Sequence, residues 1–356
     1  MKYNKIFKNY KNLKVLITGS TGFKGSWLTF WLEKLGAKVV GVGLPPEKNS
    51  IIFQKLDLDK NIKQYFIDIT NYTKINSIIK KEKPDLIFHL AAQSIVSLGY
   101  KNPINTFMTN IIGSANILQS FRTTGTKGLI YVSSDKCYLN LNKNRSFKES
   151  DPLGGLDNYS SSKASAENIF LSYHHSYFKN NAYCKAVSVR AGNVVGGGDF
   201  KENRIVPDII NSIYKKKKLI IRNPNSTRPW QHVLEPLSGY LLLGQKILDN
   251  KIRINTQPSY NFGPNTKNCQ RVKFLIKSIQ LLTNKKIKFS ISKKKEFSES
   301  KLLRVNIDKA KKELKWTPKL NLHQTLDFTC QWYKSLFEKK NVKKITLDQI
   351  SIYSEK

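Results

Sequence analysis

Residues 13–25 read LKVLITGSTGFKG, an apolar run followed by three glycines that are separated by two residues each. The apolar run predicts a short buried strand, and residues 26–35 continue in a helical pattern. Glycines let the backbone turn tightly and approach a pyrophosphate, and a helix N-terminus adds free N–H groups and a partial positive charge. No Gly-Lys-Ser/Thr follows, which excludes a Walker A loop. The stretch therefore predicts a strand, a phosphate-binding turn and a helix.

The rest of the N-terminal half alternates between short apolar runs and helical patterns. The predicted strands are residues 15–18, 38–42, 63–67, 86–89, 128–133 and 185–189. Helical patterns lie between them, as at 72–81, 106–123 and 161–178. Such alternation is typical of an α/β, Rossmann-type fold, in which a doubly wound parallel sheet carries helices on both faces.

The pattern changes after Gly192, which indicates a second unit. Gly/Pro-rich loops extend to Pro229, residues 231–248 look helical, and residues 260–263 look like a late strand of the same sheet. The expected division is a dinucleotide-binding domain at 1–192 with 231–263, a smaller, mostly helical substrate-binding domain at 193–230 and 264–340, and a loose tail at 341–356.

The chain of 356 residues carries a formal net charge of +36. Its lysines are dispersed in short clusters, as at 215–218, 285–288 and 293–295, and do not form one arm or one stripe. A lysine-rich composition on solvated faces is therefore favoured over nucleic-acid binding, and a milder role in steering a phosphate-bearing substrate stays open.

Cysteine and apolar content exclude other classes of protein. Cys137, Cys184, Cys269 and Cys330 are scattered without a Cys-x-x-Cys motif and histidines are few, so neither a metal site nor a disulfide framework is expected. No apolar run approaches the ~20 residues of a membrane span, and Met1–Lys5 lack the apolar core of a signal peptide. We therefore expect a cytoplasmic protein without membrane contact.

Tyr159 and Lys163 are four residues apart in a predicted helix. Positions with this spacing share a helix face, so the phenol and the ammonium point the same way. A nearby cation lowers the pKa of tyrosine from about 10, which makes Tyr159 a candidate proton acceptor. Many helices carry Tyr-x-x-x-Lys by chance, so two exposed helix residues are the alternative on this spacing alone.

Several motifs together resemble the extended short-chain dehydrogenases/reductases, which modify nucleotide sugars. They are the glycine turn, HLAAQ at 89–93, SSD at 133–135 and Tyr159-x-x-x-Lys163. Finer details resemble the branch of CDP-glucose 4,6-dehydratases, at GFKGSW (22–27), SDKCY (134–138), RAGNVVGGGD (190–199), RNP (222–224) and TRPWQHVLEP (227–236). The resemblance runs from about residue 10 to 335. It implies NAD as cofactor and CDP-glucose as substrate.

The implied reaction oxidises the C4 hydroxyl by hydride transfer to NAD, eliminates water across C5–C6 and returns the hydride to C6. By this resemblance, Tyr159 is the base for the O4 proton, and Lys163 lowers its pKa and binds the nicotinamide ribose. Ser134 hydrogen-bonds O4, and Asp135 is the general acid that protonates the leaving C6 hydroxyl. That role needs a raised pKa, which burial could supply.

Lys136 stands where the similar dTDP-glucose dehydratases carry the glutamate that removes the C5 proton. A protonated lysine cannot accept a proton, so Lys136 is a base only if burial or Lys163 depresses its pKa. Otherwise it would stabilise the enolate at O4, and a surface lysine without a role is the third interpretation. The resemblance implies that Asn110 supports the catalytic lysine through a water. The alternative, that Asn110 has only a structural role in its helix, is nearly as well supported.

The resemblance also assigns binding residues. The cofactor contacts are Gly19, Thr21, Gly22, Phe23, Lys24, Gly25, Asp68, Ile69, Ala91, Ala92, Gln93, Asn110, Tyr159 and Lys163. Substrate contacts suited to an anionic diphosphate are Asn193, Arg204, Arg222 and Arg228. NAD over NADP rests on the resemblance, because residues 41–45 after the second strand contain no acid for the ribose 2′-OH. The preference for CDP over other nucleotides also rests on the resemblance.

Family members pair through two long helices of each subunit. Here these are residues 106–123 and 161–178, and the second carries Ile169, Phe170, Tyr173 and Tyr177, more apolar surface than one sheet face needs. A homodimer is therefore predicted.

Two other functions stay open. An NDP-sugar epimerase or reductase on the same fold is the first, and Asp135-Lys136 argue against it because simple epimerases need no acid to expel water. A non-catalytic nucleotide- or RNA-binding scaffold is the second, and the complete set of Ser134, Tyr159 and Lys163 argues against it.

Overall fold

The structure is a computed structural model that describes residues 7–47, 51–141, 145–181, 183–252, 254, 257–265, 268–292 and 303–356. The expectations for Met1–Lys5 and for the basic cluster 293–295 concern residues outside these ranges. Within them, no helix is long and apolar enough to cross a membrane. The described residues also contain no group of three His, Cys, Asp or Glu side chains that could hold a metal ion.

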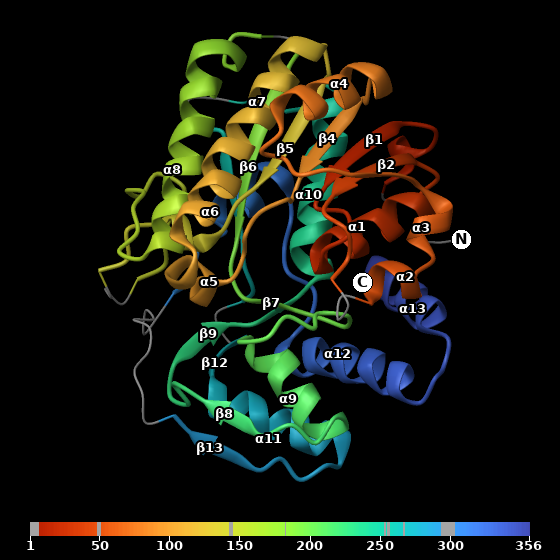
Figure 1. The fold of residues 1–356 in the computed structure, drawn as a ribbon, viewed down its shortest axis with the longest axis vertical. Helices are drawn as coiled ribbons and strands as arrows, with labels where there is room; N and C mark the ends of the chain where they lie inside the picture. Colours follow the sequence, from red (N-terminus) through yellow and green to blue (C-terminus); the bar gives the residue numbers. More distant parts are fainter. Residues whose placement is uncertain are drawn as a thin grey trace.

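A seven-stranded parallel sheet forms the centre of the larger part of the molecule (Figure 1). In spatial order its strands are β11 (Ser259–Phe262), β6 (Lys185–Ala191), β5 (Gly128–Val132), β4 (Leu86–His89), β1 (Lys14–Thr18), β2 (Lys38–Gly43) and β3 (Lys63–Phe66). All seven predicted strands are confirmed to within two residues. The strand order reverses between β1 and β4, and doubly wound folds form their ligand crevice at the carboxyl ends of the strands at such a point.

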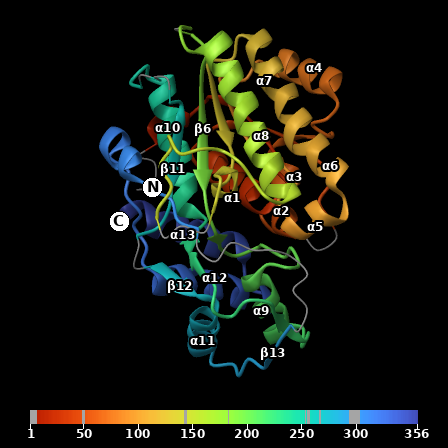
Figure 2. The same cartoon turned by 90° about the vertical axis from the view of Figure 1, so that its left-hand side faces the viewer.

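Helices cover both faces of this sheet (Figure 2). One face carries α1 (Phe23–Lys34) and α10 (Leu234–Leu248), and the other carries α4 (Tyr72–Glu82), α7 (Gly113–Thr124) and α8 (Asn158–Tyr173). Successive side chains of β1 divide between the two layers, because Val15 and Ile17 join the first apolar cluster and Leu16 joins the second. Burial on both faces explains why these strands read as continuous apolar runs.

A second lobe below the sheet combines short strands and helices (Figure 1). Its strands pair two by two as β7 (Val194–Val195) with β10 (Gln231–His232), β8 (Leu219–Ile221) with β13 (Phe289–Ile291), and β9 (Thr227–Pro229) with β12 (Cys269–Arg271). Its helices are α9 (Ile205–Tyr214), α11 (Val272–Thr283) and α12 (Leu322–Phe337). The helix expected at 231–248 begins later, at Leu234, because the two residues before Val233 pair with β7.

Shorter helices complete the chain. They are α2 (Ile52–Lys55), α3 (Leu58–Asn61), α5 (Val96–Lys101), α6 (Pro103–Phe107) and single helical turns at Lys8–Tyr10, Met108–Ile112, Asp135–Cys137, His174–Phe178 and Ala310–Leu314. The helix predicted at 106–123 is therefore split by the π-helical turn Met108–Ile112 between α6 and α7.

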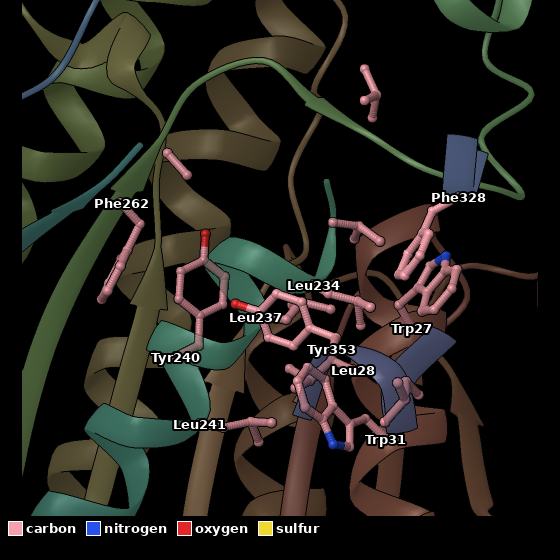
Figure 3. Close-up of a cluster of buried hydrophobic side chains, with 14 of the residues drawn as sticks. Trp27, Leu28, Trp31, Leu234, Leu237, Tyr240, Leu241, Phe262, Phe328 and Tyr353 are labelled. Atoms are coloured by element: carbon pink, nitrogen blue, oxygen red, sulfur yellow. The ribbon is translucent and has the colours of Figure 1, made fainter. Parts of the chain in front are cut away.

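The expectation of a loose tail at 341–356 is wrong. Helix α13 (Val342–Glu355) begins at Asn341, whose side chain accepts a hydrogen bond from the backbone N–H of Lys344. Its Tyr353 packs edge-on against Trp31 of α1, with ring centroids 6.1 Å apart, and donates a 2.8 Å hydrogen bond to the buried carboxylate of Glu235. Figure 3 shows Tyr353 between the apolar side chains of α1 and α10.

The orientation of Phe170 also differs from the expectation. From the sequence, Phe170 counts toward apolar surface beyond what the sheet face needs, but its side chain is fully buried and stacks on Tyr131 of β5, with ring centroids 5.3 Å apart. It belongs to the core between α8 and the sheet. Ile169 and Tyr173 are partly exposed but also pack against this core, and Tyr177 is 49% exposed.

Candidate active site

The glycine turn between β1 and α1 is closed to side chains. Gly19 has a φ of +73°, and a Cβ there would lie 2.8 Å from the backbone nitrogen of Ala91. A Cβ at Gly25 would lie 1.9 Å from the carbonyl oxygen of Gly19. The first turn of α1 therefore packs directly on the loop, and Gly22 is its N-cap. A bare backbone at a helix N-terminus is the arrangement that accepts a pyrophosphate.

This turn opens into a cavity of about 820 Å³ that is lined by both the sheet's carboxyl edge and the second lobe. The predicted site residues that line it are Gly19, Thr21, Gly22, Phe23, Lys24, Gly25, Asp68, Ile69, Ala91, Ala92, Ser134, Asp135, Lys136, Tyr159, Lys163, Asn193, Arg204, Arg222 and Arg228. The fold thus brings the expected cofactor, catalytic and substrate groups to one place.

Gln93 and Asn110 are not among the described residues that line the cavity. The Asn110 side chain accepts a hydrogen bond from the Gln93 backbone N–H at 2.9 Å and donates to the Gln93 carbonyl at 3.1 Å and to Ser162 Oγ at 2.8 Å. Its amide therefore fixes the loop after β4 against α8. These contacts favour the structural interpretation of Asn110.

The polar residues after β5 meet the first turns of α8. Ser134 Oγ accepts a hydrogen bond from the Lys136 backbone N–H and donates one to Asp135 Oδ1, both at 3.2 Å. A side-chain hydrogen bond also joins Ser134 to Tyr159. Asp157 caps α8 by accepting a 2.9 Å hydrogen bond from the Ser160 backbone N–H. The cap and the strand end together position the tyrosine beside the serine.

The pKa of Tyr159 differs from the expectation. Burial raises it to about 12, and the hydrogen bond with Ser134 and the charge of Arg204 offset only part of this rise. Burial also lowers the pKa of Lys163 to about 8, which leaves its ammonium mostly protonated at neutral pH but does not bring the pKa of Tyr159 below its ordinary value. The protein alone therefore keeps Tyr159 protonated.

Asp135 is a buried carboxyl group with an available oxygen. Its side chain is 4% exposed, and burial raises its pKa although Lys136, Ser134, Arg228 and Lys24 oppose the shift. Within the described structure, Asp135 Oδ2 has no hydrogen-bond partner. Gly192 gives this oxygen its space, because a Cβ at that position would lie 2.4 Å from it. The raised pKa agrees with what the sequence-based interpretation of Asp135 requires.

Lys24 adds a positive charge near Asp135, whereas the sequence assigns it only to cofactor binding. It lies in the first turn of α1 and lines the cavity. Burial is the main cause that lowers its pKa to about 8, Lys163 and Arg204 lower it further, and Asp135 opposes the shift. The charges around Asp135 thus include Lys24 as well as Lys136.

The second lobe supplies arginines that are already engaged. Arg204 Nη1 pairs with Asp199 at 2.8 Å, and its Nη2 donates to Ser94 Oγ at 2.9 Å, so this side chain links the second lobe to the loop after β4. Sequence reasoning missed Asp199 and Ser94, although Asp199 ends the quoted motif at 190–199. Arg222 Nη2 donates a 3.4 Å hydrogen bond to the carbonyl oxygen of Asn203.

Comparison with known proteins identifies the family to which this chain belongs. The family model for GDP-mannose 4,6 dehydratase matches residues 16–329. The chain belongs to this family. It is 35% identical over 354 residues to the CDP-glucose 4,6-dehydratase of Salmonella typhimurium, with 98% of each chain covered. It is also 26% identical to a UDP-glucuronate 4-epimerase of Thermodesulfobacterium geofontis, over 91% of this chain and 97% of the relative.

Solved structures support the family's fold for this chain. An epimerase of Methanothermobacter thermautotrophicus superposes with a TM-score of 0.80 at 24% identity and covers 97% of this chain and 98% of its own. The dTDP-glucose 4,6-dehydratase of Bacillus anthracis, solved in complex with NAD, superposes with a TM-score of 0.76 at 24% identity, over 94% of this chain and 99% of its own. The GDP-mannose 4,6 dehydratase family thus accounts for the sheet and the second lobe together.

Proposed function

We propose that this family member is a CDP-glucose 4,6-dehydratase, which converts CDP-glucose to CDP-4-keto-6-deoxyglucose and water. The observation that carries the proposal is the buried Asp135 beside Ser134, Tyr159 and Lys163. An epimerase needs a proton acceptor at O4 but no acid to expel water. A carboxyl group with a raised pKa and an available oxygen supplies such an acid.

The cavity fits NAD. Gly19, Gly22 and Gly25 form a cradle that a Cβ would fill, at the N-terminus of α1. Asp68 and Ile69 line the cavity just after the end of β3 and suit the adenosine half of the cofactor. Bound there, NAD would supply the acceptor for the C4 hydride and the donor that returns it to C6.

Tyr159 and Ser134 act at the sugar's O4. The Tyr159 phenolate removes the O4 proton, and Ser134 donates a hydrogen bond that orients the same oxygen. Because burial raises the pKa of Tyr159 to about 12, the phenolate needs added positive charge, which the Lys163 ammonium and the nicotinamide ring of bound NAD would supply. Deprotonation is therefore coupled to loading of the cavity.

Asp135 and Lys136 act at C6 and C5. Asp135 gives its proton to the C6 hydroxyl as water leaves. Lys136 stands next to it at the end of β5 and acts on the C5 proton or on the developing enolate. Asn193, Arg204, Arg222 and Arg228 bind the diphosphate and its nucleoside.

A direct test offers the purified protein CDP-, dTDP- and GDP-glucose with NAD. The expected product is a 4-keto-6-deoxy sugar from CDP-glucose, detected by its absorbance in alkali and by the loss of one water in its mass. No net NADH should accumulate, because the hydride returns to the product. Steady NADH formation would instead indicate a dehydrogenase, and an isomer of unchanged mass would indicate an epimerase.

We also propose a homodimer. Ile104, Met108 and Ile112 follow one another at four-residue spacing and are 70%, 44% and 42% exposed, beside the partly exposed Ile169 and Tyr173 of α8. A second copy of the chain, paired helix against helix, would cover this apolar face. Light scattering should give about twice the 40.9 kDa of one chain. A monomer of that mass would contradict the proposal.

A further inference from the structure

The second lobe forms a part of the cavity that the proposed chemistry does not use. Its walls come from the first turn of α9, the end of β8 and the start of α11. Apolar side chains line it at Val206, Pro207, Ile221 and Val272. Apolar walls of this kind accept the faces of a planar ring, while polar groups among them read its edge.

Two charged residues interrupt these apolar walls. Asp208 lies in the first turn of α9, and Arg222 follows β8, and both line the cavity. Arg222 donates a hydrogen bond to the Asn203 carbonyl at 3.4 Å, and the Asn203 backbone stabilises the carboxylate of Asp208. Burial raises the pKa of Asp208 to about 6, and Arg222 opposes that shift. Asp208 is therefore mostly ionised at neutral pH and offers only hydrogen-bond acceptors.

The reacting sugar and the base occupy opposite ends of a nucleotide sugar. The sugar must contact Ser134 and Tyr159, which belong to the sheet side of the cavity. The diphosphate then extends toward Arg228, which is 7% exposed in the second lobe. A base beyond the diphosphate would then reach the walls formed by α9 and β8, which Asp208 also lines.

We propose that Asp208 selects the base by accepting a hydrogen bond from the 4-amino group of cytosine. Uracil and thymine carry a 4-oxo group at that edge, and two acceptors facing each other repel. The inference rests on the proposed function, because it assumes a nucleotide sugar in this cavity. It explains in physical terms a preference for CDP that sequence motifs indicate only by resemblance.

Isothermal titration of CDP and UDP into the NAD-loaded protein tests this selection. The wild-type protein should bind CDP about tenfold to a hundredfold more tightly than UDP, the range of one hydrogen bond to a charged group. Asp208→Asn keeps the shape but can also donate to a 4-oxo group, so the two affinities should come within about threefold of each other. Glu338→Gln is the matched control, because Glu338 is an exposed carboxylate that pairs with Lys340 at 2.7 Å and does not line the cavity, and it should keep the wild-type ratio.

A modified ligand tests the same inference on the wild-type protein, so the result does not depend on whether a variant folds. A CDP analogue with pyrimidin-2-one as its base lacks the 4-amino group and should bind wild-type protein about tenfold or more weakly than CDP. Equal affinity of wild-type protein for CDP and UDP, or an unchanged ratio in folded Asp208→Asn, would overturn the inference.

These binding measurements are separate from turnover. If the wild-type protein prefers CDP, loses this preference in Asp208→Asn and yet forms no 4-keto-6-deoxy product, the inference stands and the proposed reaction fails. If CDP-glucose is dehydrated with the same preference in both proteins, the reaction stands and Asp208 does not read the base.

Discussion

The two walls of the cavity differ in how their polar groups are held. On the sheet side, Asp135 and Lys163 are buried, and Asp135 Oδ2 has no hydrogen-bond partner among the described residues. On the second lobe, Arg204 is already paired with Asp199 and bonded to Ser94. Desolvated, unpaired groups have shifted pKa values, which suit proton transfer, while paired charges suit recognition. The difference supports our proposal that the sheet side carries out the chemistry and the second lobe recognises the substrate.

Tyr159→Phe is the strongest test of this division. Removal of the phenolic oxygen should lower kcat by roughly two or more orders of magnitude, the general scale for an acid–base group, and should leave CDP affinity unchanged. Tyr177→Phe is a suitable control, because Tyr177 is 49% exposed and does not line the cavity. Near-normal turnover of folded Tyr159→Phe would place the chemistry on other groups.

Lys136→Ala should separate oxidation from elimination. Tyr159 and Lys163 are intact in this variant, so C4 should still be oxidised, while the rate of product formation falls about a hundredfold. In a single turnover, the absorbance of reduced NAD should persist, whereas the wild-type protein should show at most a transient. Lys344→Ala, outside the cavity, should behave as wild type. Product at the normal rate from Lys136→Ala would leave Lys24 as the next lysine to examine.

Gly192→Ala tests the space around the acid. The new Cβ would lie 2.4 Å from Asp135 Oδ2, so the carboxyl must move away from the position that the wild-type structure gives it. Elimination should slow about tenfold to a hundredfold, because misplacement of a reacting group by about 1 Å can cost that much. Steady-state kinetics with CDP-glucose measures the rate. A fall in CDP affinity with unchanged kcat would contradict the assignment of Asp135 to the chemical step.

Arg204→Gln should have the smallest effect, and the effect should fall on KM more than on kcat. The variant loses the ion pair with Asp199 and weakens the contact with Ser94, so KM for CDP-glucose should rise about threefold to tenfold. The value of kcat should fall less, because the charge of Arg204 offsets only part of the rise in the pKa of Tyr159. The matched control is Arg122→Gln, because Arg122 is an exposed arginine that stacks on Tyr177 away from the cavity. A loss confined to kcat would mean that the second lobe takes part in catalysis.

Local signals explain why the sheet was predicted well and the last helix was not. The strands β1, β4 and β5 are short apolar runs between turn residues, and this pattern depends on neighbours in sequence. Helix α13 carries lysines and polar residues among its apolar positions, and its stability comes from Tyr353 packing on Trp31 and bonding to Glu235. Partners more than a hundred residues away leave no local signal.

The sequence by itself determined the parallel sheet and the glycine turn, because strand periodicity and glycine spacing are local properties, and its resemblance to a known family indicated many of the residues that meet in the cavity. Only the tertiary structure decided the protonation of the site and the partners of its charges. The pKa of Tyr159 rises because the fold removes water from it, which the spacing to Lys163 could not reveal. Likewise Asp208 becomes a candidate for base selection only where α9 and β8 bring it to the cavity.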